Sequence, residues 1–367
     1  MLVFRAFGIW LIVWLTAFVA PANSGDFSKP GPFAVGWQAF TVDDVTGLHP
    51  LKSRVWYPAA DPASDTANTP ASSIKNAAPA TSGPFPLVVV IHGLSGAGIS
   101  YQPLGELLAS YGFVVVASDY DYALMNRKPD PGVSTADMVQ VRLIFQRPAN
   151  VMRTIAEADA MTVPGGTLAG LIDTSRIGIF GHSTGGTTGL QAGGARIDFP
   201  ELADWCAANK TERFGGSCQF LFHESAIAAA FGAQDPLAGA LPPRWDSRVA
   251  ALVLAAPGDE LQVFGPTGIA AVKVPALIMF SSTDDVVRPD INALWAYDGI
   301  GSKEKALAVF DAGGHNMFVN AVPQFDEAAA LTTAFFLSVL KGDKAGTAAL
   351  LPGAASFPGM TYKTTFQ

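Results

Sequence analysis

Short apolar runs that alternate with helical segments constrain the fold of this 367-residue chain most strongly. The runs PLVVVIHG and FVVVASDY are continuous and rich in valine, which is typical of strands buried on both faces of a parallel sheet. The stretch between them, YQPLGELLASYG, has the apolar spacing of a helix. Strands that alternate with helices predict an α/β fold, with a mostly parallel central sheet and helices on both of its faces.

The same alternation continues toward the C-terminus. Four more strands are expected in RIGIFGHS, VAALVLAAPG, PALIMFSSTDD and ALAVFDAGGH, and helices in RPANVMRTIAEADAM and DEAAALTTAFFLSVLKG. Two strands joined by a turn, FAVGWQAFTVDDVTG and LKSRVWYPA, precede the first buried run. We therefore expect one domain over residues 23–367.

Two segments interrupt this pattern. Residues from about 60 to 84 are rich in Ala, Pro and Ser and predict a long exposed loop. Residues from about 195 to 248 predict an insertion, either a wall or lid over the carboxyl edge of the sheet or a helical excursion packed on one side.

The N-terminus has the features of a signal peptide over residues 1–22. Arg5 precedes a long apolar run, and Ala20-Pro21-Ala22 matches an A-x-A cleavage site. An uncleaved membrane anchor is the alternative, and no second span is expected. Either reading predicts a secreted or periplasmic protein, in which Cys206 and Cys218 would pair in a disulfide inside the insertion.

The formal net charge of −8 gives no basic footprint for nucleic acid, so nucleic acid is not an expected partner. No His/Asp cluster has the spacing of metal ligands, so the sequence implies no metal and no cofactor.

A serine with a glycine two residues before it and another two residues after it follows the strand RIGIF. Gly181-His182-Ser183-Thr184-Gly185 fits G-x-S-x-G, and a small-residue segment that could begin a helix comes next. A nucleophilic serine occupies such a strained strand-to-helix turn, and its neighbours must be small because side chains would collide there. The pattern predicts Ser183 as a nucleophile.

A serine hydroxyl needs a base, and His315 in DAGGHNMF is the candidate among the five histidines. It follows the last strand, which is where the base falls in the chain order Ser, Asp, His. Asp284, the first carboxylate after PALIMFSST, is the preferred partner of this base, and Asp285 is the near alternative. Asp259 and Glu260 are weaker alternatives one strand earlier.

A tetrahedral intermediate also needs two aimed hydrogen-bond donors for its oxyanion. The backbone amide of Thr184 is the first candidate, because it follows the nucleophile. The backbone amide of Leu94 is the second, in the loop after VVVIHG.

These pieces in this order resemble a serine α/β-hydrolase. More narrowly, they resemble the bacterial esterases grouped with platelet-activating-factor acetylhydrolase and called dienelactone-hydrolase-like. The resemblance extends from about Phe33 to Leu340. True dienelactone hydrolases use a cysteine nucleophile, whereas this chain has Ser183, which favours ordinary ester hydrolysis.

The leading functional hypothesis is a carboxylic-ester hydrolase that degrades short-acyl, phospholipid-like or polyester substrates through an acyl-enzyme. A peptidase or amidase with the same triad is the second hypothesis, and a non-catalytic binding module on a hydrolase scaffold is the third.

Overall fold

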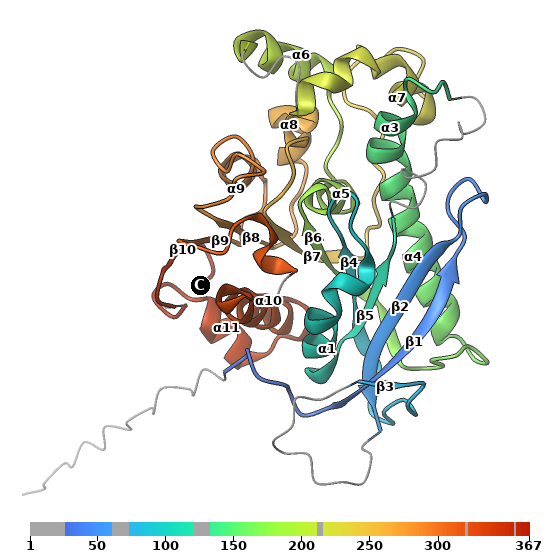
Figure 1. Cartoon of the computed structure of the whole chain (residues 1–367), viewed down its shortest axis with the longest axis vertical. Coiled ribbons are helices and arrows are strands. Elements are labelled where there is room, and N and C mark those ends of the chain that lie inside the picture. The colour runs from blue at the N-terminus through green and yellow to red at the C-terminus, as the bar shows by residue number, and fades with distance from the viewer. Residues whose placement is uncertain (1–25, 61–72, 121–132, 211–215, 320–321, 356) are drawn as a thin grey trace, which may run out of the picture.

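The computed structural model describes the chain except for residues 1–25, 61–72, 121–132, 211–215, 320–321 and 356. Within the described residues, the strands form one ten-stranded sheet in the order β10-β9-β8-β7-β6-β4-β5-β2-β1-β3 (Figure 1). The strand bounds are β1 Ala34–Val42, β2 Leu51–Ala59, β3 Ile74–Lys75, β4 Phe85–Ile91, β5 Val114–Ser118, β6 Ile172–His182, β7 Val249–Ala255, β8 Ala276–Ser281, β9 Lys305–Phe310 and β10 Met360–Thr364.

The six strands β4 to β9 are parallel to one another and form the centre of the sheet. All seven residues of β4 are buried, which accounts for the continuous apolar run that the sequence shows there. Its Val89 lies opposite Ile179 of β6, and this register brings the carboxyl ends of the two strands to the same edge. The α/β fold predicted from the sequence is confirmed.

Helices cover both faces of the sheet, and an apolar core lies on each face. Alternate residues of the central strands belong to one core or the other. In β4, Leu87, Val89 and Ile91 belong to one apolar cluster and Val88 and Val90 to the other. One face is covered by α1 (Gln102–Ser110), α10 (Pro323–Lys341) and α11 (Lys344–Leu350). The other is covered by α4 (Arg147–Thr162), α5 (Thr184–Ala192) and α9 (Ala293–Gly299).

Antiparallel pairs occur toward both edges of the sheet, although the edge strand β3 pairs parallel with β1. Strands β1 and β2 form the predicted N-terminal pair, and β2 joins the sheet antiparallel to β5. Strand β10 pairs antiparallel with β9, and neither it nor β3 was expected from the sequence, because both are short and not continuously apolar. Residues 61–72 of the predicted loop lie outside the described residues. In the remainder, Ile74–Lys75 is exposed but pairs with β1 as a strand rather than a loop.

The segment between α5 and β7 is the predicted insertion. It contains α6 (Phe199–Ala208), the 3-10 helix η4 (Gly216–Phe222) and α7 (Glu224–Ala230), which lie together at the top of Figure 1. Helices α6 and η4 pack on η5 (Leu261–Phe264), the segment that follows β7. The Cys206–Cys218 disulfide joins α6 to η4 with a Cα–Cα distance of 5.9 Å, as predicted.

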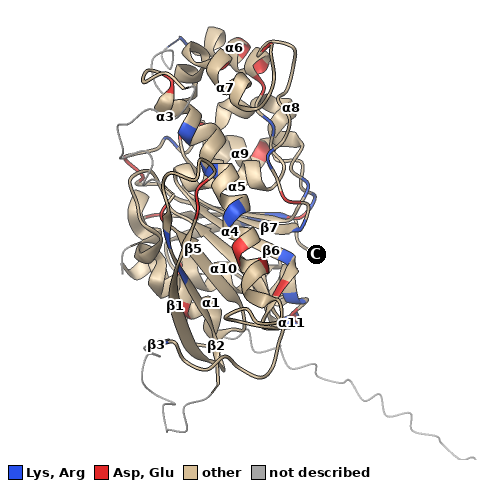
Figure 2. Cartoon of the chain, turned by 90° about the vertical axis from the view of Figure 1, so that its right-hand side faces the viewer, with Lys and Arg blue, Asp and Glu red and all other residues tan. Residues whose placement is uncertain are grey.

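The predicted signal peptide lies outside the described residues. Among the residues that are described, no helix is long and apolar enough to cross a membrane. Figure 2 shows lysine, arginine, aspartate and glutamate interspersed along the ribbon rather than gathered by sign.

Candidate active site

Ser183 occupies a sharp turn between β6 and α5. Its backbone has φ 55° and ψ −129°, a conformation that non-glycine residues rarely adopt and that costs energy unless the surroundings enforce it. The turn is held against the end of β7, because the Ser183 amide donates to the Ala255 carbonyl at 3.0 Å and the Gly258 amide donates to the Ser183 carbonyl at 2.9 Å. The serine side chain is therefore presented at the carboxyl edge of the sheet, where it is partly exposed.

The glycines around the serine are required by close backbone approaches. A Cβ on Gly181 would collide with the carbonyl of Gly185, and a Cβ on Gly185 would collide with the carbonyl of Ile91 on β4. Because both obstacles are backbone atoms, no side-chain rearrangement could relieve them. The glycines allow the turn to close and helix α5 to pack directly on β4.

Ser183, His315 and Asp284 form one hydrogen-bonded line. The Ser183 hydroxyl donates to His315 Nε2 at 2.9 Å, and His315 Nδ1 donates to Asp284 Oδ2 at 2.8 Å. His315 begins η6 (His315–Phe318) directly after Gly313 and Gly314, whose φ values of 107° and 65° turn the chain back over the sheet edge. The structure thus brings together three side chains that lie far apart in the sequence.

Asp284 is held as a carboxylate on both of its oxygens. Its Oδ1 accepts the Val286 and Val287 amides, each at 2.9 Å, while Oδ2 accepts His315. Burial raises the pKa of Asp284, but the hydrogen bond from His315 and the two backbone amides outweigh burial and hold this pKa below its usual value. An ionised Asp284 fixes the Nδ1–H tautomer of His315 and leaves Nε2 free to accept a proton.

The three alternative carboxylates lie elsewhere. Asp285 is exposed, and so is Asp259. Glu260 is buried beneath the first turn of α5, where it accepts the hydroxyls of Thr184 and Thr187, both at 2.8 Å. Burial first, and then the nearby Asp259 charge, raise the pKa of Glu260.

The two amides predicted as oxyanion donors flank the serine. Gly93, which precedes Leu94, approaches so closely that a Cβ on it would lie 3.0 Å from Ser183 Cβ. Thr184 is the first residue of α5, where backbone amides lack helical acceptors. None of the described residues accepts a hydrogen bond from the amide of Leu94 or of Thr184, which is compatible with the predicted role.

A buried polar layer supports the loop that carries Leu94. His92 Nε2 accepts the Tyr120 amide at 2.8 Å, so Nδ1 carries the proton and donates to the Gly93 carbonyl at 2.6 Å. Arg147 of α4 donates to the His92 carbonyl at 2.5 Å and to the Thr188 hydroxyl at 3.3 Å. His92 and Arg147 therefore brace this loop, and the sequence predicted no such role for Arg147.

Two hollows lie near the loops of the site, and neither is lined by Ser183, His315 or Asp284. One, of about 160 Å³, lies between the insertion and the loop after Asp284, with Trp205 and Ser217 on one side and Val286 and Arg288 on the other. The insertion and this loop therefore lie side by side.

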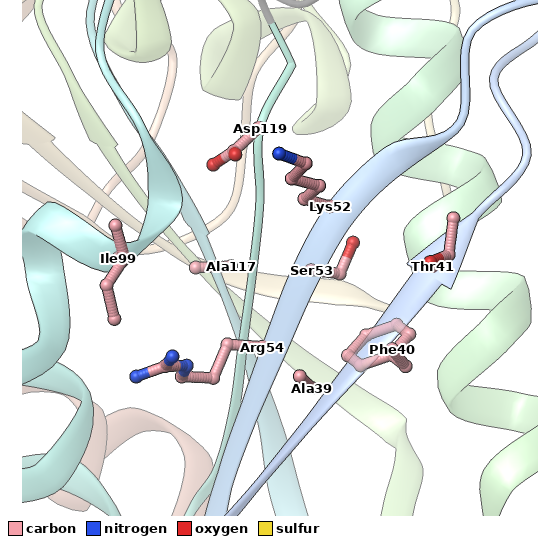
Figure 3. A pocket seen from close by; sticks show the side chains of 9 residues that line it. All are labelled: Ala39, Phe40, Thr41, Lys52, Ser53, Arg54, Ile99, Ala117 and Asp119. Carbon is pink, nitrogen blue, oxygen red and sulfur yellow. The ribbon is translucent and has the colours of Figure 1, made fainter.

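The other hollow, of about 450 Å³, lies beside η1 (Gly98–Tyr101), between β1, β2 and β5 (Figure 3). Lys52 and Arg54 line it on the strand side, and Asp119 accepts the Gly98 amide at 2.8 Å on the other side. Ser183, His315 and Asp284 do not line this second hollow.

A family model described as Chlorophyllase matches residues 49–199. The match includes the loop with Leu94 and the turn with Ser183 and ends before Asp284 and His315. Together with the sheet order, it supports an α/β-hydrolase fold for this chain. A comparison with curated proteins finds no match. The narrower resemblance to platelet-activating-factor acetylhydrolase and dienelactone hydrolase stays a prediction.

Proposed function

From the α/β-hydrolase fold and the geometry of Ser183, His315 and Asp284, we propose that this protein is a serine carboxylic-ester hydrolase. The observation that carries the proposal is the continuous line from the Ser183 hydroxyl through His315 to Asp284, with distances of 2.9 Å and 2.8 Å. A nucleophile, a base and an orienting carboxylate in hydrogen-bond reach are the requirements of acyl transfer.

The first half of the reaction forms an acyl-enzyme. Ser183 Oγ attacks the ester carbonyl carbon while its proton passes to His315 Nε2. The Leu94 and Thr184 amides receive the oxyanion of the tetrahedral intermediate. The C–O bond to the alcohol then breaks, and the alcohol leaves with the proton from His315 Nε2.

The second half repeats these steps with water. His315 Nε2 takes a proton from the attacking water, the same two amides hold the second oxyanion, and the carboxylic acid leaves as Ser183 recovers its proton. Asp284 stays ionised throughout and stabilises the imidazolium that forms in both halves.

Two exposed apolar side chains on the loops of the site support the proposed substrate class. Leu94 is 54% exposed and Val286 is 63% exposed, so the loops of the oxyanion donors and of the acid both present apolar surface. Such surface suits esters with an apolar part, namely short-acyl, phospholipid-like or polyester substrates. The family match adds chlorophyll as a further ester to test.

The proposed location is outside the cytoplasm, either secreted or periplasmic. The A-x-A pattern at Ala20-Pro21-Ala22 and the Cys206–Cys218 disulfide both support export, because disulfides persist in oxidising compartments. N-terminal sequencing of protein recovered from an exporting host tests the cleavage, and an intact N-terminus would contradict it.

A substrate panel with the Ser183→Ala variant as the matched control tests the function. We expect nitrophenyl esters from acetyl to palmitoyl, a soluble polyester or chlorophyll to be hydrolysed, and Ser183→Ala to lose about 10³-fold or more in kcat. A fluorophosphonate should label Ser183 alone. Faster cleavage of a matched anilide would favour an amidase, and failure to label Ser183 would favour a binding module.

A further inference from the structure

Two buried side chains, Tyr101 and His182, take no part in the hydrolysis steps but contact the backbone that carries the base. The Tyr101 hydroxyl lies 2.7 Å from His182 Nδ1, and His182 Nε2 lies 2.9 Å from the carbonyl oxygen of His315. A carbonyl oxygen only accepts, so His182 Nε2 must carry the proton. The bare Nδ1 of the neutral ring then accepts the proton of the Tyr101 hydroxyl.

Both groups stay uncharged, so the hydrogen bond between them runs in one direction only, from the Tyr101 hydroxyl to His182 Nδ1. Burial, and then the charge of His315, lower the pKa of His182 to about 3. Burial also raises the pKa of Tyr101 well above its usual value. Neither side chain changes protonation near neutral pH, and His182 cannot serve as a second base.

The chain of contacts continues to the other side of the site. The Gly93 backbone lies beside this pair, because a Cβ on it would be 3.6 Å from His182 Nδ1, and it partly offsets the effect of burial on the pKa of Tyr101. Gly93 lies against Ser183 and directly precedes Leu94. Tyr101 and His182 therefore connect the loop of the predicted oxyanion donor with the loop of the base, although these loops are more than 200 positions apart in the sequence.

Packing fixes the two rings in place. The Tyr101 ring meets Phe180 edge-on at a centroid distance of 5.9 Å, and the His182 ring lies 5.7 Å from Phe318. The exposed fraction of each side chain is 2%. Because packing holds both rings, the position of one loop restrains the position of the other through them.

We propose that Tyr101 and His182 are positioning residues that set the orientation of His315 relative to Ser183 and the Leu94 amide. The loop before His315 contains Gly313 and Gly314, so no side chains restrict its backbone and its orientation depends on hydrogen bonds to its neighbours. The Gly314 amide donates to the Ser281 hydroxyl at 3.2 Å, and the hydrogen bond from His182 to the His315 carbonyl restrains the base residue itself. The proposal rests on the proposed function, because it concerns the same site.

Tyr101→Phe is the principal test, with Tyr57→Phe as the matched control. Each change removes one buried hydroxyl and keeps the ring. The Tyr57 hydroxyl likewise accepts one hydrogen bond, from Gln38 at 3.2 Å, and donates one, to the Ala77 carbonyl at 2.8 Å, but it has no contact with the triad. We expect Tyr101→Phe to lower kcat about 3- to 10-fold with KM within about 2-fold, as for a lost hydrogen bond that matters in the transition state.

Tyr57→Phe should leave kcat within about 2-fold of the unsubstituted enzyme, although it can lose as much stability as Tyr101→Phe. Equal kcat values for the two variants would overturn the positioning role. A rise in KM with unchanged kcat for Tyr101→Phe would also overturn it, because that result indicates a role in substrate binding.

A second pair of variants separates the two hydrogen bonds of His182. The amide of His182→Gln can still donate to the His315 carbonyl, whereas His182→Ala cannot. We expect the kcat of His182→Gln to lie between those of the unsubstituted enzyme and of His182→Ala. If Gln and Ala lower kcat equally in folded protein, the bond to the His315 carbonyl is not the restraint.

A substrate-independent measurement distinguishes failure of this proposal from failure of the proposed function. In ¹⁵N-histidine NMR of the full chain, His182 should show a protonated Nε2 and a bare Nδ1 from pH 5 to pH 8. Tyr101→Phe should keep this tautomer, because the His315 carbonyl still needs a donor, but should shift the Nδ1 resonance, because Nδ1 loses its hydrogen bond. A protonated Nδ1 of His182 in the unsubstituted protein overturns the proposed contacts. If this NMR pattern is found but no ester is hydrolysed, the function fails while the geometry stands.

Discussion

Asp284→Asn exchanges one carboxylate oxygen for an amide nitrogen in the line that orients the base. The structure decides which oxygen is replaced. Asp284 Oδ1 accepts the amides of Val286 and Val287, each at 2.9 Å, so the oxygen of the asparagine must stay there. The opposite orientation would leave two backbone amides facing an NH₂ group, at a cost of about 1–3 kcal/mol each. The new NH₂ group therefore faces His315 Nδ1.

An NH₂ group at that position forces the wrong tautomer of the base. His315 Nδ1 must accept the asparagine N–H, so the ring proton moves to Nε2 and points at the Ser183 hydroxyl. That ring cannot take the serine proton without first breaking its bond to the asparagine. We expect kcat to fall about 10³- to 10⁴-fold, which corresponds to about 4–5.5 kcal/mol of transition-state stabilisation. The folded structure should be kept, because the two backbone bonds remain.

The assay is ester hydrolysis at neutral pH, with Asp285→Asn as the matched control. Asp285 is the next residue, carries the same charge and is exposed, so its kcat should stay within about 2-fold. Circular dichroism checks that both variants are folded. A folded Asp284→Asn variant with less than 10-fold loss, or a larger loss for Asp285→Asn, would refute the assignment of the acid.

Three further predictions concern stability. Replacing Cys206 and Cys218 together by serine should lower the free energy of unfolding by about 3 kcal/mol in the chain-entropy model, measured by urea denaturation. Under conditions in which the domain is still folded, this variant should also show a changed preference among the esters of the panel. An unchanged preference would contradict a role for the insertion in substrate selection. Glu260 has a raised pKa in the folded state, so the unfolded chain loses this proton first as pH rises above about 4.3, and stability falls until the folded pKa is passed. Glu260→Gln should remove that fall, and parallel urea midpoints for the two proteins from pH 4 to pH 8 would contradict the assignment. The pKa of His182 falls from 6.5 to about 3 on folding, so the unfolded chain binds this proton more tightly and stability is lost as pH falls from 6.5 to about 3. His182→Gln should therefore lose less stability in acid. Equal midpoints of acid unfolding for the two proteins would count against a neutral His182.

The sequence by itself determined the sheet and the candidate nucleophile. Strands such as β4 are buried on both faces, so every position must be apolar, and this requirement is visible as a continuous run. The turn at Ser183 is local at Gly181, where a Cβ would collide with Gly185 in the same turn, whereas Gly185 is required by the carbonyl of Ile91 on β4. The short edge strands β3 and β10 escaped prediction because partner strands far along the chain specify them.

Only the tertiary structure decided how distant groups share the site. In the sequence Asp284 and Asp285 are neighbours of one chemical type, and it is the fold that turns Asp284 toward His315 and leaves Asp285 in solvent. The same holds for Glu260 beneath α5 and for the contact of Tyr101 with His182. Apolar periodicity indicates which residues of one strand or helix are buried, and it can be read along that element alone. A hydrogen bond requires two atoms within about 3 Å, so it depends on how separate elements pack against each other.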